Sequence, residues 1–275
     1  IPYTLTMAGF AIGNGLIGRV VDRIGIAWAL IGAAVIQGLG FLSAAYLPGF
    51  AGITLLHMAI GFGSAVCFAS LIADVSLWFL KRRGIAVGII ASGNYLSGAL
   101  WPIVLSGVMT DGGWRAVYTV LGWIILITVI PGAVFLRRRL PLEAFARSDQ
   151  ISAARARATG FSPNALTILL GLAGIGCCVA MSMPQVHIVA FCVDLGYGPA
   201  VGGQMLSLML LGGVASRILS GLIADRIGGV RTLLIGSFAQ TVALMLYLPS
   251  DGLMSLYVVS TVFGLSQGGI VPSYA

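Results

Sequence analysis

A single arginine, Arg217, lies in the middle of a long apolar segment of this 275-residue chain. It precedes Asp225 of the following loop by about 12 Å of helix, at 1.5 Å per residue. If the segment crosses a bilayer, a central arginine costs about 2.5–3.5 kcal/mol on insertion scales. Because a guanidinium group matches a carboxylate bidentately, we predict that Arg217 binds the carboxylate of a substrate. The alternative is a structural pairing of Arg217 with a polar group of another helix.

Other polar side chains also lie inside apolar segments. We expect Asn94, Tyr95, Gln185 and His187 to line a cavity with Arg217, because unpaired polar groups are costly in hydrocarbon. Hydrogen bonding between helices is an equal alternative for Asn94 and Tyr95. His57 is a candidate for proton coupling, since a histidine can gain or lose a proton near neutral pH. The alternative for both histidines is a hydrogen-bonded packing role.

The composition predicts which elements must position these residues. Hydrophobic residues make up 59% of the chain and charged residues only 8%, whereas a soluble domain has about 25% charged residues. The apolar residues also occur in blocks of about 20, the length that crosses a bilayer core of about 30 Å. We therefore predict an all-α polytopic membrane protein.

The distribution of positive charge predicts the orientation of the chain. Apart from Arg115 and Arg217, the fifteen Lys and Arg residues lie in alternate loops or at the helix ends that face them. This bias is typical of cytoplasmic loops. The net charge of +7 is therefore an orientation signal, and we expect no nucleic-acid partner. The polar segment 137–163 is predicted to be a cytoplasmic linker.

Turn residues and charges divide the chain into about nine apolar spans. The linker separates an N-terminal bundle, residues 1–136, from a C-terminal bundle, residues 164–275. The chain begins and ends inside apolar runs, so we expect it to be truncated at both ends and unable to transport by itself. The predicted spans are 1–18, 27–47, 52–79, 85–109, 114–136, 164–192, 199–223, 231–249 and 253–275.

Segments 18–25 and 221–228 share the pattern Gly-x-x-x-Asp-Arg-Ile-Gly, each directly after an apolar span. When they are aligned, Arg217 corresponds to Asn14, so the two halves differ in one charge. We expect the paired charges to act in gating, by forming contacts between helix ends in one state and breaking them in another. The alternative is solvated loop charges. The four residues concerned are Asp22, Arg23, Asp225 and Arg226.

Asp74 lies near the cytoplasmic end of its span, about two turns before Lys81. We expect it to pair with Arg19 or Arg23 across the bundle and to belong to the same gating set. Contact with the substrate is the less favoured alternative.

Two related halves, a basic central loop and the duplicated Gly-x-x-x-Asp-Arg-x-Gly loop resemble the major facilitator superfamily of transporters. Gly113-Trp114-Arg115 is also similar to the family pattern at the start of its sixth helix. The resemblance implies two pseudo-symmetric helix bundles, with the predicted spans corresponding to family helices two to ten. It also implies transport by alternating access.

Segment 78–93 is similar to a pattern of monocarboxylate transporters and the oxalate/formate antiporter group, with Lys-Arg-Arg followed by spaced glycines. In that group an arginine of the eighth helix, four residues before Gly-Leu, binds the substrate carboxylate. Arg217 matches it, four residues before Gly221-Leu222. Monocarboxylate transporters carry an aspartate one turn earlier, where this chain has Gly213. The resemblance therefore does not carry over proton coupling through an Asp–Arg pair.

The sequence thus predicts a secondary transporter, a symporter or antiporter, of a small organic anion, most simply a monocarboxylate. The alternatives are a carrier of another metabolite, a drug exporter and, less favoured, a non-transporting membrane sensor. We expect no catalytic set, no metal site and no cofactor, and we interpret the four cysteines as small buried hydrophobic residues. The expected partners are the anion, protons or a counter-anion, and the lipid bilayer. We expect a monomer in a bacterial inner membrane.

Overall fold

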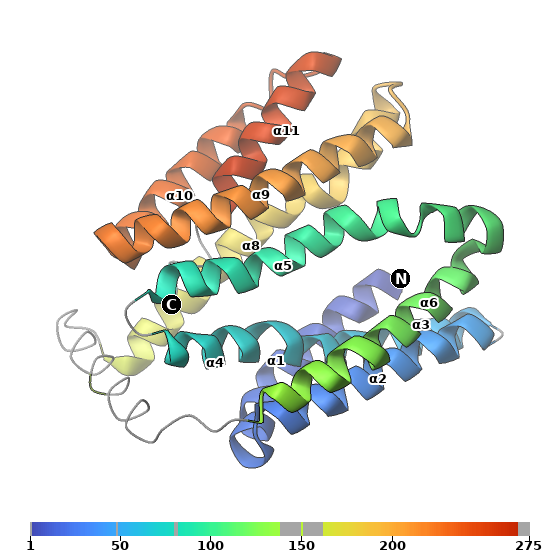
Figure 1. Cartoon of the computed structure of the whole chain (residues 1–275). Helices are drawn as coiled ribbons and strands as arrows, with labels where there is room; N and C mark the ends of the chain where they lie inside the picture. The colour runs from blue at the N-terminus through green and yellow to red at the C-terminus, as the bar shows by residue number, and fades with distance from the viewer. Residues whose placement is uncertain (1, 48, 80–81, 138–149, 151–161, 269–275) are drawn as a thin grey trace. The chain divides into compact units, whose positions relative to one another are not determined.

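The computed structural model describes residues 2–47, 49–79, 82–137, 150 and 162–268 (Figure 1). Within these ranges the chain is almost entirely helical and contains no strand. The predicted linker 137–163 lies for the most part outside the described residues. The remainder forms two compact units, one of residues 1–74 with 102–140 and one of residues 75–101 with 141–275.

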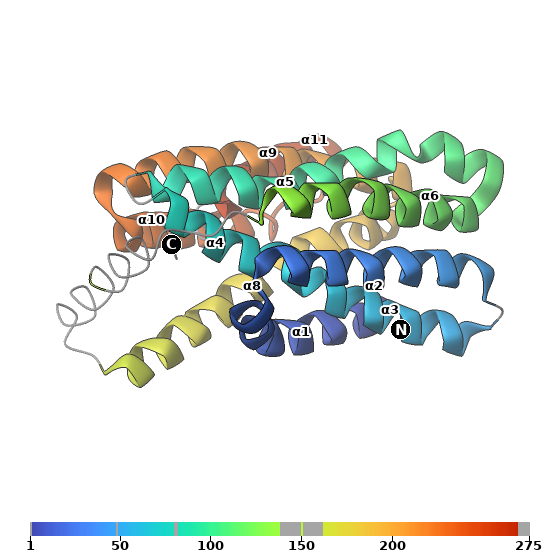
Figure 2. The same ribbon diagram turned by 60° about the horizontal axis from the view of Figure 1, so that its bottom comes forward.

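The first unit consists mainly of helices from the N-terminal part of the chain. Its core includes Ile17, Leu30 and Ala133, and α2 packs beside α3 (Figure 2). A Cβ at Gly61 of α3 would lie 1.9 Å from the carbonyl oxygen of Thr6 in α1, so glycine is what lets these two helices approach. The elements are α1 (Pro2–Ile24), α2 (Ile26–Tyr46), α3 (Phe50–Ala65), a π-helical turn η1 (Val66–Ser70), the first part of α4 (Leu71–Trp78) and α6 (Ser106–Phe135).

The second unit contains most of α5 and the helices of the C-terminal part of the chain. Its core is rich in sulfur and aromatic side chains, among them Cys192, Met205, Met209 and Phe263, which are fully buried. Helix α9 packs against both α8 and α11. The elements are α5 (Arg83–Val104), α8 (Pro163–Asp194), α9 (Pro199–Ile227), α10 (Gly229–Met245) and α11 (Leu253–Gln267).

In the part of the chain that the structure describes, seven helices are long and apolar enough to cross a membrane. They lie at 2–24, 26–46, 50–78, 83–104, 106–135, 167–194 and 199–227. Helices α10 and α11 are apolar but shorter, with 17 and 15 described residues. Many large apolar side chains are exposed, such as Phe135 at 81% and Leu248 at 87%, as expected for surfaces that face lipid. The chain is a multi-pass membrane protein.

The repeated loops have the same backbone geometry. Gly25, between α1 and α2, has φ 83° and ψ 157°, and Gly228, between α9 and α10, has φ 89° and ψ 156°. Positive φ favours glycine because it has no Cβ. Gly113, at the predicted break before the fifth span, also has positive φ, 67°, and interrupts α6. The glycines that the sequence places at breaks between the apolar spans therefore have the backbone angles of turns.

Candidate functional site

Arg217 lies in the middle of α9 and is 2% exposed. Its Nη1 donates a hydrogen bond to the carbonyl oxygen of Ala91 in α5. Its guanidinium carbon lies 3.7 Å from the centroid of the Tyr95 ring, a cation–π contact. Within the described part of the chain its Nε is buried and has no hydrogen-bond partner. The arginine is therefore held on two sides and keeps one donor unused.

Close packing of α5 on α9 brings Arg217 to its partners. A Cβ at Gly84 would lie 2.5 Å from the carbonyl oxygen of Gly221, and one at Gly88 would lie 2.6 Å from that of Arg217. Small residues at such positions let helix backbones approach closely. The hydroxyl of Ser92 also reaches across, 3.5 Å from the carbonyl oxygen of Val214. The glycine-rich start of α5 thus sets the position of Ala91 and Tyr95.

Tyr95 is 3% exposed and links three helices of the second unit. Its ring lies under the guanidinium group of Arg217 in α9, and its hydroxyl donates to Sδ of Met181 in α8 over 2.9 Å. The ring also packs on Gly213, where a Cβ would lie 2.5 Å from two ring carbons. The ring therefore occupies the space beside Gly213, one turn before the arginine, where the resemblance to monocarboxylate transporters implied an aspartate side chain.

Two glutamines form a second polar group beside Tyr95. Nε2 of Gln185 in α8 donates to Oε1 of Gln267 in α11 over 2.7 Å. Nε2 of Gln267 donates in turn to the carbonyl oxygen of Met209 in α9 over 3.2 Å. Gln267 is 1% exposed, and a Cβ at Gly213 would meet both the Tyr95 ring and the Nε2 of Gln267, at 2.5 and 3.2 Å. The unit thus brings together a cation, an aromatic ring and two amides.

The other predicted binding residues have different surroundings. Asn94 is exposed on α5, although Tyr95 next to it is buried, and His187 is exposed on α8. His57 belongs to the other unit. Its Nδ1 lies 2.8 Å from the carbonyl oxygen of Ile53 and its Nε2 lies 3.0 Å from the hydroxyl of Tyr118. Since a carbonyl only accepts, Nδ1 carries the proton and Nε2 accepts from Tyr118.

The loop residues of the predicted gating set lie at helix ends. Both carboxylate oxygens of Asp225 accept from the first turn of α5, Oδ1 from the Gly84 amide over 2.7 Å and Oδ2 from the Ile85 amide over 3.1 Å. A carboxylate is favourable there because the first amides of a helix lack partners within it. The other members differ in exposure: Asp22, Arg23 and Arg226 are exposed, and Asp74 is half-buried.

The role of Met181 could not be predicted from the sequence. A methionine in an apolar helix looks the same whether its sulfur accepts a hydrogen bond or the side chain only packs. Gln267 was recognisable only as a polar residue in an apolar run.

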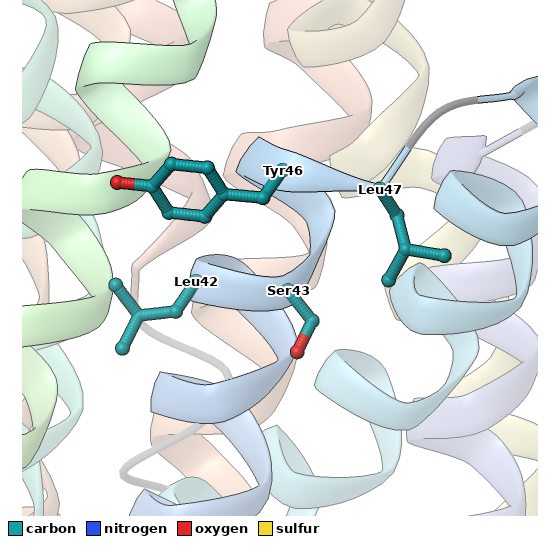
Figure 3. A pocket seen from close by; sticks show the side chains of 4 residues that line it. All are labelled: Leu42, Ser43, Tyr46 and Leu47. Carbon is teal, nitrogen blue, oxygen red and sulfur yellow. The ribbon is translucent and has the colours of Figure 1, made fainter.

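A separate pocket of about 430 Å³ lies on the first unit at the end of α2 (Figure 3). Its four lining residues, Leu42, Ser43, Tyr46 and Leu47, carry no charge, so they offer an anion no counter-charge.

Comparison with known proteins gives a match to the model of the Major Facilitator Superfamily over residues 1–275. The chain is 23% identical over 266 residues to the MFS-type transporter pynF of Aspergillus niger, covering 94% of this chain and 59% of that protein. It is 28% identical over 220 residues to the Agnestins efflux protein AgnL12 of Paecilomyces divaricatus, covering 78% and 49%. It is 30% identical over 194 residues to monocarboxylate transporter 11 of Homo sapiens, covering 70% and 41%. The chain thus spans only about half the length of these relatives.

Proposed function

Because the chain belongs to the Major Facilitator Superfamily, we propose that it is part of a secondary transporter that moves a small organic anion by alternating access. The proposed substrate is a monocarboxylate, and the proposed anion-binding residue is Arg217. The name of one relative, a monocarboxylate transporter at 30% identity, supports this substrate class. Transport is accompanied by protons or by a counter-anion.

The observation that carries the proposal is the incomplete neutralisation of Arg217. Among the described residues no aspartate or glutamate forms a salt bridge with it, and its buried Nε has no partner. A cation–π contact is worth about 0.5–2 kcal/mol, whereas placing an arginine at the bilayer centre costs about 2.5–3.5 kcal/mol. A carboxylate that accepts hydrogen bonds from the guanidinium group offsets the part of this insertion cost that the cation–π contact leaves. The burial of Arg217 therefore favours an anionic ligand.

Around this cation we propose that Tyr95 and Gln185 contact the bound anion, with Asn94 and His187 lining the path that leads to it. Tyr95 supports the guanidinium group, and Gln185 adds a polar group beside the ring. His57 is retained as a candidate for proton coupling. For it to bind a second proton, the hydrogen bond at Nε2 would have to reverse so that Nε2 donates to the Tyr118 oxygen, whereas the Nδ1 bond to the Ile53 carbonyl would stay as it is.

For gating we propose that the loop charges hold helix ends together in one state and release them in the other. Asp225 supports this role because its carboxylate joins the end of α9 to the start of α5. Asp22, Arg23 and Arg226 belong to the same repeated pattern, and Asp74 is assigned to the same set. The bundles 1–136 and 164–275, joined by a cytoplasmic segment 137–163, would be the two bodies that rock.

We also propose that the transporter is a monomer in the cell membrane with segment 137–163 on the cytoplasmic side, as the arrangement of Lys and Arg favours. A bacterial inner membrane stays a prediction from the short loops. The three relatives named above come from fungi and from a mammal. Localisation of a tagged protein in its native cell would decide this point.

A second candidate function is export of a larger metabolite. It is favoured by the 28% identity to an efflux protein. An exporter of neutral or cationic compounds has no need of the Arg217 charge, whereas an anion carrier does. Replacing that charge therefore separates the two functions.

Binding to the whole protein in detergent tests the anion site directly. We expect lactate, but not its uncharged amide, to raise the melting temperature, because only lactate offers a carboxylate to Arg217. Arg217→Gln should lose this stabilisation. Arg217→Lys should keep a weaker one, because lysine retains the charge but cannot bind a carboxylate through two parallel hydrogen bonds. Equal stabilisation of the wild type by lactate and its amide would refute the proposal.

A further inference from the structure

The two glutamines beside Tyr95 have fixed orientations. A backbone carbonyl can only accept a hydrogen bond, so the amide group that faces the Met209 carbonyl must be the Nε2 of Gln267. The Oε1 of Gln267 then faces Gln185, which must present its own Nε2 over the 2.7 Å contact. Gln267 is 1% exposed and has no room to exchange this pattern for one with water. The carbonyl thus determines the direction of both amides.

This direction decides which atom Gln185 offers to a ligand. Its nitrogen is committed to Gln267. Gln185 lies one turn after Met181 on α8, and the hydroxyl proton of Tyr95 goes to Sδ of Met181, so the hydroxyl oxygen is left to accept from the Gln185 amide. The atom that Gln185 can offer is therefore Oε1, which accepts hydrogen bonds and cannot donate them.

The acceptor lies close to the cation. Arg217 covers one face of the Tyr95 ring, and Gln185 lies one turn of α8 after Met181, which accepts from the hydroxyl of the same ring. The Tyr95 side chain thus reaches from the cation toward the turn of α8 that carries Gln185. An acid whose carboxylate binds Arg217 would have the substituent on its second carbon near the Gln185 oxygen.

We propose that this site selects 2-hydroxy acids over 2-oxo acids of the same carbon skeleton. A hydroxyl group donates to the Gln185 oxygen, whereas a keto oxygen faces another acceptor and both are left without a hydrogen. Sites built to hydrogen-bond one substituent discriminate strongly against an analogue that cannot form the bond. The proposal rests on the proposed function, because it places the carboxylate on Arg217.

The test compares three-carbon acids on the whole protein. Dissociation constants for lactate, pyruvate and propionate are measured by calorimetry on purified protein. We expect lactate to bind on the order of tenfold more tightly than pyruvate, with propionate between them. This ratio is a property of the wild type and needs no variant. Equal affinities for lactate and pyruvate, or tighter binding of pyruvate, would overturn the proposal.

Gln267→Leu tests the cause of the selection. Without the Gln267 oxygen, the Gln185 amide can turn and present its nitrogen to a keto group, so the ratio should fall to about twofold or less. The matched control is Gln240→Leu, which removes another buried glutamine, 3% exposed, from α10. It should leave the ratio unchanged. If both variants change the ratio equally, the effect comes from packing and the proposed orientation is wrong.

A change at Arg217 separates this proposal from the proposed function. Arg217→Gln should abolish binding of all three acids. If it does so while the wild type fails to distinguish lactate from pyruvate, the anion site stands and the hydroxy-acid selection fails. If Arg217→Gln binds the acids as well as the wild type, the proposed function itself fails and the selection fails with it.

Discussion

Helices α1 and α9 end in the same eight-residue pattern but differ in their middle. Gly25 and Gly228 close both patterns with nearly identical φ and ψ. At the aligned interior position, α1 has Asn14, whose Nδ2 donates to the carbonyl of Phe10 within its own helix over 2.9 Å. Helix α9 has Arg217, which contacts α5 instead. The shared ends thus build turns, and the differing centres place a buried cation in α9 where α1 has an amide that is bonded within its own helix.

The central polar side chains of α1 and α9 differ in where they find hydrogen-bond partners. The Asn14 side chain satisfies its amide locally, so it needs nothing from a neighbouring helix. Arg217 cannot do so, because its long side chain is buried and its Nε has no partner among the described residues. The proposed binding site therefore belongs to the second unit, whereas the repeated loop occurs in both units.

Among changes that keep the Arg217 charge, the largest effect is expected at Gly213, because an added methyl group would meet the Tyr95 ring at 2.5 Å. Gly213→Ala should displace the ring from Arg217 and weaken lactate binding by about tenfold or more, as overpacking costs about 1–3 kcal/mol. Gly203→Ala is the matched control on the same helix, since nothing lies within 4 Å of its added Cβ. Calorimetry on both variants checks this, and equal affinities would contradict the packing account.

The next effect is expected from the ring that supports the cation. Tyr95→Leu should weaken lactate binding several-fold, because a cation–π contact is worth about 0.5–2 kcal/mol. Tyr95→Phe keeps the ring and should stay within about threefold of the wild type, because it loses only the contacts of the hydroxyl group. If phenylalanine were as damaging as leucine, the hydroxyl rather than the ring face would be the important group.

A smaller effect is expected at the repeated loop. Asp225→Ala removes the carboxylate that accepts from the Gly84 and Ile85 amides and should destabilise the protein by about 0.5–2 kcal/mol, as for other lost helix caps. Lactate affinity should change little. Thermal unfolding in detergent measures the first quantity and calorimetry the second. Asp225→Asn, which keeps one acceptor oxygen, should recover part of the stability.

The smallest effect is expected at the counterpart of Arg217 in α1. Asn14→Ala removes one hydrogen bond within a helix, so stability should change by no more than about 0.5–1.5 kcal/mol and lactate affinity should be unchanged. Binding measured on Asn14→Ala beside Arg217→Ala gives the comparison in its simplest form. A loss of binding in both would mean that the two halves share the site.

The sequence predicted the helical membrane fold, the breaks between spans and the interior position of Arg217. These follow from apolar length, from glycines at turns and from the cost of a charge in hydrocarbon. The sequence could not predict which ring supports Arg217, because contacts between distant helices leave no trace in periodicity. Gly213 illustrates this: it was visible as the absence of an aspartate, and only the structure shows the Tyr95 ring in its place.

Neighbouring residues show a second limit. Asn94 and Tyr95 were grouped because both are polar in an apolar span, but successive residues of a helix point about 100° apart. One of them can face α9 while the other does not, and the structure buries Tyr95 and exposes Asn94. The contact between Gln185 and Gln267 joins residues 82 positions apart. Such pairings depend on tertiary packing, which residue type and spacing do not reveal.

Anion flux through the whole protein in liposomes tests the central claim most directly. Vesicles loaded with unlabelled lactate are supplied with labelled lactate outside, with and without a pH gradient, for the wild type and Arg217→Gln. We predict saturable uptake by the wild type and background uptake by a variant that still inserts and folds. Uptake that is equal in both proteins would contradict the assignment of Arg217 as the carboxylate site.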